Sequence, residues 1–86
     1  MAKVDAVAVT VEWVDSCGLA NGPWHRASDV RALRPSRMVT RGFLVVDRKR
    51  YIVVAGSLAS SGHVAADVMA IPRGAILRLR CHKVAP

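Results

Sequence analysis

Hydrophobic and polar side chains alternate over several parts of this chain, which is the pattern of β-strands with one buried face. In residues 4–13 the large apolar side chains fall on odd positions, namely Val7, Val9, Val11 and Trp13. Small or polar side chains occupy most of the even positions between them. The spacing therefore predicts a strand over residues 4–13 whose valine and tryptophan side chains lie in the core.

Four further segments have the composition of strands, and they span residues 38–47, 51–55, 64–71 and 75–81. A charged corner at residues 48–50 joins the first two of these as a predicted hairpin, and residues 72–74 form a tight turn before the last. Gly42, inside a predicted strand, indicates a β-bulge or a sharp bend. We therefore predict a mostly β chain with a single domain over residues 1–86, folded as a five-stranded curved sheet or barrel of SH3-like or OB-like size.

The segment between the first two predicted strands is rich in turn residues, which predicts a long loop. Within it, Ser28 and Asp29 are suited to cap one or two helical turns that run to Leu33, because their side-chain oxygens accept backbone N–H groups. Pro35 ends this helix, since it disfavours the helical conformation at Arg34. At most one short helix is expected.

The charge of the chain changes this picture from a fold to a function. Its 86 residues include 13 Lys and Arg against 6 Asp and Glu, for a net charge of +7. Most of the cations are arginines, whose planar guanidinium group pairs well with phosphate. We therefore expect an anionic partner. A core this small is also marginally stable alone, which favours a homo-oligomer, either a dimer or a tetramer.

Residues suited to catalysis or metal binding are scattered. The six acidic residues and the three histidines, His25, His63 and His82, have neither the spacing of a catalytic pair nor that of a metal site. Cys17 and Cys81 lie far apart without a CxxC spacing, so both are expected to be free thiols. We predict that the protein is no enzyme and uses no cofactor and no metal.

The chain also lacks the signals of export and membrane insertion. No run of about 18 apolar residues occurs, and no basic segment followed by an apolar core occurs near the first residue. We therefore expect a cytoplasmic protein that does not contact a membrane.

The loop between the first two strands holds the first candidate binding residues. Trp24 lies there beside cationic residues, where it serves either as a stacking surface for a base or as a plug for the mouth of a barrel. Asp15 and Ser16 either form a turn or hydrogen-bond a base edge or a ribose hydroxyl. Trp13, by contrast, follows the apolar alternation and is predicted to lie in the core.

Arginines from several strands and turns are candidate phosphate ligands. A closed barrel or a subunit interface would bring together Arg41, Arg73, Arg78 and Arg80. In the last predicted strand, Arg78 and Arg80 alternate with leucines and predict an exposed basic face. The corner at residues 48–50 is either a solvated turn or a patch that contacts phosphate.

Short motifs occur along the chain in a fixed order. They are V-x-W-x-D-S at residues 11–16, a second tryptophan at Trp24, G-F-L at 42–44, an apolar segment at 51–55 followed by Ser57, and I-P-[KR]-x-x-I at 71–76. This order resembles that of a family of very small bacteriophage proteins, and the group looks like the anti-CBASS sponge proteins. The match spans most of the chain. The excess of arginine in residues 26–50 departs from the family pattern and leaves the identity of the ligand open.

The resemblance implies a compact β oligomer that sequesters cyclic nucleotide signals of antiphage immunity in the host cytoplasm, in pockets between subunits and without turnover. The nucleotide-binding residues that it implies are Asp15, Ser16, Trp24, Arg41, Ser57 and Arg73. The aspartate and the first serine would contact base or ribose, the tryptophan would stack, Ser57 would hydrogen-bond, and the arginines would bind phosphate. A cyclic dinucleotide suits such a site because it offers two phosphates and two bases to matched halves of a symmetric oligomer.

Three other functions remain open at this point. A nucleic-acid binder would use the basic strands and Trp24 along a phosphate backbone, although the cations are dispersed along the sequence and one aromatic side chain is expected to be exposed. An inhibitor that docks on a host protein would use the same charge against a different surface. A structural part of a virion is the third, and the lack of a coiled coil argues mildly against it.

Overall fold

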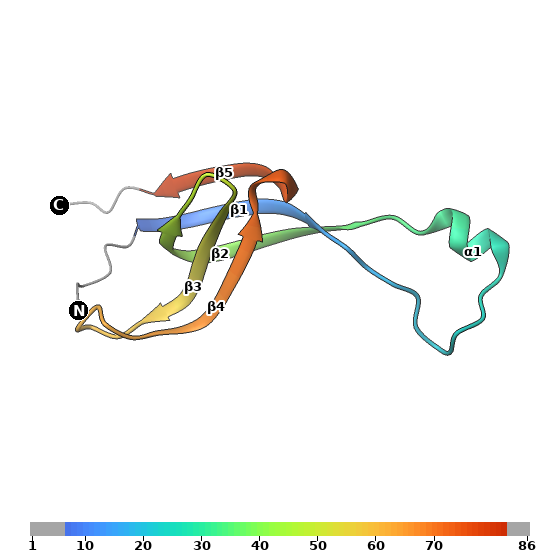
Figure 1. Ribbon diagram of the computed structural model, residues 1–86, viewed down its shortest axis with the longest axis horizontal. Coiled ribbons are helices and arrows are strands. Elements are labelled where there is room, and N and C mark those ends of the chain that lie inside the picture. Colours follow the sequence, from blue (N-terminus) through green and yellow to red (C-terminus); the bar gives the residue numbers. More distant parts are fainter. Residues whose placement is uncertain (1–6, 83–86) are drawn as a thin grey trace.

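In the computed structural model, the described part of the chain, residues 7–82, forms a five-stranded antiparallel sheet with one short α-helix (Figure 1). The strands are β1 (Val7–Asp15), β2 (Ser36–Asp47), β3 (Tyr51–Leu58), β4 (Ala65–Pro72) and β5 (Ile76–His82). Helix α1 spans Ala27–Ala32, and a 3-10 turn, η1, spans Arg73–Ala75. The order across the sheet is β4-β3-β2-β1-β5, so β4 and β5 form the two edges. The predicted mostly β fold is confirmed, as an open sheet rather than a closed barrel.

All five predicted strands are present with small shifts at their ends. The strand predicted over residues 4–13 continues to Asp15, and its first predicted residues, 4–6, lie outside the described part of the chain. Strand β3 runs to Leu58 rather than to Ala55. The tight turn predicted at residues 72–74 is the 3-10 turn η1.

The core lies on one face of β1 and against the strands on the far side of β2. Its buried members are Val9, Val11, Trp13, Ile52, Val54 and Ile71. The odd residues of β1 supply half of this set, as their alternation predicts. Trp13 is 7% exposed, and its Nε1–H donates a hydrogen bond of 2.8 Å to Thr40 Oγ1, so burial leaves no unpaired indole donor.

Two features of β2 bend the sheet so that β3 crosses over the core. The β2–β3 register shifts between Leu44 and Val46, which leaves Val45 as an extra residue of β2. The bulge therefore lies three residues beyond Gly42, and the prediction of a bulge at that glycine is wrong in position. Gly42 instead permits a close approach, because a Cβ there would lie 2.9 Å from Val54 Cγ1 and closer still to the Ala55 carbonyl oxygen.

The connection between β1 and β2 projects far from the sheet (Figure 1). We call residues 16–35, which include α1, the arm. The radius of gyration is 16.7 Å and the extents are 53 × 23 × 23 Å, whereas a compact domain of this length has a radius of gyration of about 12 Å. The difference follows from the arm, which leaves the sheet instead of folding over it.

Helix α1 confirms the predicted helix but corrects its cap. It begins at Ala27 after Arg26, and no side chain caps its first turn, so Ser28 and Asp29 lie inside the helix rather than at its start. The predicted stop before Pro35 is close, since α1 ends at Ala32 and Leu33 is already extended. No residue of α1 is buried.

Truncation of a central core side chain tests this arrangement. Ile52 is fully buried on β3, so Ile52→Ala is expected to lower the free energy of unfolding by about 3 kcal/mol through lost burial and the cavity left behind. The measurement is urea denaturation followed by circular dichroism. Val39→Ala, at an exposed position of β2, is the matched control and should cost under about 1 kcal/mol. Equal losses for the two variants would contradict this description of the core.

Candidate anion-binding site

Even-numbered residues of β1 point away from the core, and their neighbours on β2 and β5 are basic. Thr10 lies directly opposite Arg41 on β2 and directly opposite Arg80 on β5. Because adjacent strands are about 4.8 Å apart, the two arginines flank Thr10 with Cα atoms about 10 Å from each other. Residues facing each other across a ladder share one face of the sheet, so both guanidinium groups rise from the same surface.

The row extends along β5 by the same alternation. Arg78 and His82 lie two residues on either side of Arg80 and share its face. We call this surface, made of Thr10, Arg41, Arg78, Arg80 and His82, the basic face. The exposed basic face that the sequence predicts for the last strand is thereby present, and β1 and β2 enlarge it.

A shallow pocket of about 430 Å³ lies in the middle of the basic face. Its lining residues are Ala8, Val9, Thr10, Arg41, Gly42, Arg80 and His82. Thr10 is 7% exposed at its floor, and its hydroxyl is hydrogen-bonded to His82 Nε2 at 2.7 Å. The pocket thus presents two arginines, a histidine and a hydroxyl to one incoming ligand.

The charge of the basic face is largely uncompensated. Within residues 7–82, a single ion pair is present, and none of the arginines of the basic face takes part in it. Glu12 lies opposite Arg78 across the β1–β5 ladder and offsets that charge in part. Arg41 and Arg80 have Thr10 as their common neighbour instead. Two like charges held this close favour an anion between them, and phosphate is the group that arginine pairs bind best.

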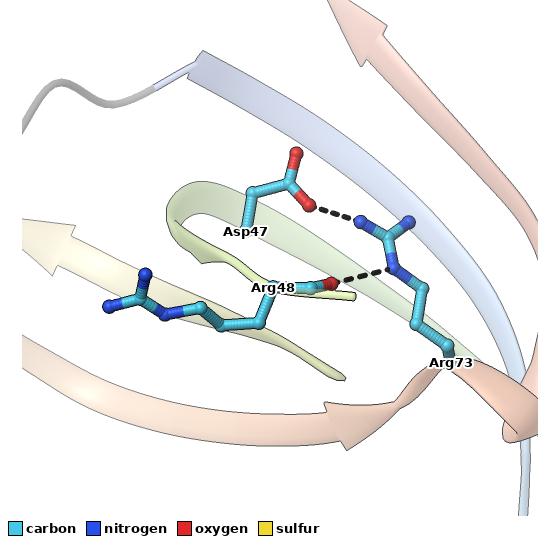
Figure 2. A network of polar contacts seen from close by, with 3 residues as sticks. All are labelled: Asp47, Arg48 and Arg73. Carbon is cyan, nitrogen blue, oxygen red and sulfur yellow. Dashed lines mark hydrogen bonds and ion pairs between the residues drawn. The ribbon is translucent and has the colours of Figure 1, made fainter. Parts of the chain in front are cut away.

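Arg73, which the sequence groups with these arginines, lies elsewhere and is engaged within the chain. Figure 2 shows its guanidinium group bridging to the turn between β2 and β3. It forms an ion pair with Asp47, and its Nε–H donates a hydrogen bond of 3.2 Å to the Arg48 carbonyl oxygen. Its backbone N–H donates to the Arg50 carbonyl oxygen at 2.8 Å. Arg73 therefore fastens η1 to the β2–β3 turn.

The motif residues at the arm are far from the basic face in the fold. Asp15 ends β1 opposite Ser36, where the two legs of the arm begin, and Ser16 is the first exposed residue beyond it. Trp24 lies in the arm and is 91% exposed. Its interpretation as a plug for a barrel mouth is wrong, because the sheet is open and the indole contacts no part of it.

Ser57 lies on β3, exposed, two residues beyond the last paired position of β2 and β3. It does not line the pocket around Thr10. Within one chain, the six nucleotide-binding residues that the motifs imply are therefore spread over the arm, the basic face, β3 and η1. Arg41 is the one among them that lines the pocket.

The described residues contain no group of three or more His, Cys, Asp and Glu side chains arranged to hold a metal ion. Cys17 and Cys81 are both free and exposed. No helix in the described part of the chain is long and apolar enough to cross a membrane.

Comparison with known proteins adds no relative to this geometry. No family model, curated protein or solved structure matches the chain. The resemblance to small phage proteins thus depends on the motifs alone and stays a prediction.

Proposed function

We propose that this protein acts by binding a phosphate-bearing nucleotide ligand on the basic face, without turning it over. The observation that supports the proposal is the placement of Arg41 and Arg80 on either side of Thr10, above a pocket of about 430 Å³ and without a carboxylate in the row. Charge-assisted hydrogen bonds from two guanidinium groups are among the strongest polar contacts available to a phosphate.

The first candidate ligand is a cyclic oligonucleotide second messenger. In this proposal the chain is encoded by a bacteriophage and works in the host cytoplasm as a homo-oligomer that sequesters the messenger. Arg41 supports it, since this residue belongs to the set implied by the motifs and lines the pocket. A second copy of the chain is required, because the pocket of one copy is shallow and cannot enclose a dinucleotide.

The second candidate ligand is a single strand of nucleic acid. The basic face is open and crosses three strands, which suits a phosphate backbone that passes over the protein. The exposed Trp24 beside Arg26 offers a stacking surface for a base. The arm gathers this aromatic side chain and several arginines on one projecting element, which removes the objection that the cations are dispersed.

A ligand panel separates the two candidates. Purified protein is incubated with cyclic di- and trinucleotides and with single-stranded DNA and RNA of several lengths, and thermal unfolding is followed with and without each ligand. Protection by one cyclic nucleotide, recovered intact after denaturation of the protein, is expected for a sponge. Protection that grows with strand length and weakens steeply with salt is expected for a nucleic-acid binder. Protection by no ligand of the panel would contradict the proposal.

A further inference from the structure

The arm contains apolar side chains that nothing in the chain covers. They are Leu19, Trp24, Val30 and Leu33, all of which are exposed. Helix α1 has six residues and buries none of them, whereas an isolated helix in water needs more than about twelve residues to be stable even marginally. The conformation of the arm therefore requires a surface against which these side chains pack.

The end of the arm is hollowed as well as apolar. A pocket of about 510 Å³ lies between α1 and the loop that precedes it. Leu19, Ala20 and Leu33 contribute its apolar wall, and His25, Asp29 and Arg34 contribute polar groups. Such a concave surface accepts side chains that project from a flat or convex partner.

A second uncovered apolar surface lies at the other end of the molecule, on the edge strand β4. Its exposed large side chains are Val68 and Met69, and Val64 precedes it. Ala66 and Ala70 are exposed beside them, and Asp67 is the one charged residue of the strand. An edge strand with an apolar exposed surface and few charges is a template for association.

We infer that the arm of one copy of this chain packs on β4 of a second copy. The charges favour this pairing, since the arm carries Arg26, Arg31 and Arg34 against Asp29, whereas β4 carries Asp67 alone. The size also fits, because a stable interface takes about 20–30 residues from each partner and the arm with its supporting strand ends is of that order. Exchange of two arms about a twofold axis would cover both surfaces on both copies.

The arm cannot cover β4 of its own chain. It leaves the sheet from the ends of β1 and β2 and extends away from it (Figure 1), while β4 is separated from β1 by two strands in the sheet order. The inference rests on the self-association that the proposed function includes, and it is independent of which ligand the basic face binds.

A cysteine pair placed on two different copies tests the contact directly. In a background of Cys17→Ser and Cys81→Ser, Val30→Cys on α1 is mixed with Val68→Cys on β4, both at positions about half exposed in the chain. Under mild oxidation the mixed disulfide is expected to form at least about tenfold faster than with the control partner Leu77→Cys, because reaction depends on access. Leu77 is equally exposed but lies on β5, at the opposite edge.

Sedimentation equilibrium on the full chain provides the second readout. The wild type is expected to be a dimer or larger, and Val30→Asp is expected to shift it to a monomer with an unchanged circular dichroism spectrum, while Leu77→Asp has no such effect. A monomer at every attainable concentration would overturn both the inference and the self-association in the proposed function. An oligomer that forms disulfides through Leu77→Cys, or between two α1 helices, but not through Val68→Cys would overturn the inference alone. Burial of Trp24 by a nucleic-acid strand in a monomeric protein would assign the arm to nucleic acid and likewise overturn it.

Discussion

Replacement of Gly42 by alanine is expected to lower the free energy of unfolding by about 3 kcal/mol or more, the upper range for overpacking of a core. The new Cβ would lie 2.9 Å from Val54 Cγ1 and closer still to the Ala55 carbonyl oxygen. The second of these is a backbone atom, so no rotation of a side chain relieves the contact. A chain of 86 residues has a total stability of roughly 4–13 kcal/mol, and this one substitution therefore removes a large part of it.

The control for this prediction is Gly74→Ala in η1. No atom lies within 4 Å of a Cβ built on Gly74, and its φ is not in the left-handed region. Its replacement should change stability by less than about 1 kcal/mol and is expected to raise it slightly, since alanine restricts the unfolded chain. Urea denaturation of both variants, followed by circular dichroism, gives the comparison. A Gly42→Ala variant as stable as the wild type would mean that β3 does not cross β2 this closely.

The double substitution Arg41→Gln and Arg80→Gln is expected to weaken binding of the nucleotide ligand by about 100-fold or more. Each arginine would supply at least one charge-assisted hydrogen bond, worth about 1.5–3 kcal/mol, and a loss of 1.4 kcal/mol is about tenfold in affinity. Neither guanidinium group pairs with a carboxylate of residues 7–82, so glutamine leaves no unpaired acid behind. The fold should therefore be unaffected.

Fluorescence anisotropy with a labelled cyclic dinucleotide and a labelled DNA single strand measures this loss, at several salt concentrations. For the single strand, removal of two phosphate contacts should also reduce the slope of log affinity against log salt by about 2. Arg48→Gln with Lys49→Gln removes the same charge from the exposed β2–β3 turn and serves as the matched control. An equal loss in this control would show that net charge, rather than the basic face, determines the affinity.

The strands of this fold were predictable because their signal is local. Alternation in β1 identifies its core face, and Trp13 lies in the core as that alternation predicts. The cap of α1 was not predictable from Ser28 and Asp29, because the helix begins one turn of sequence logic earlier, after Arg26. Propensity at a helix end yields to the path that the connecting loop imposes.

The basic face was only partly predictable because it depends on strand order. The sequence groups Arg41, Arg73, Arg78 and Arg80 without indicating which of them become neighbours. Arg80 joins Arg41 through Thr10 because β5 returns to pair with β1, a contact between residues 70 positions apart. Arg73 leaves the group because Asp47 and the Arg48 carbonyl lie beside η1. No local pattern carries either piece of information.

The position of β1 between β2 and β5 has a kinetic consequence. The first described strand pairs with the last one, as the partners Ala8 and His82 show, so the sheet cannot be completed until the whole chain has left the ribosome. Sheets dominated by such distant pairings fold slowly for their size, on a timescale of about milliseconds to seconds. During that interval one edge of β1, with its row of valines, has no partner. Rapid synthesis at high copy number would then favour aggregation, and a chaperone or a slower rate of expression would raise the yield of folded protein.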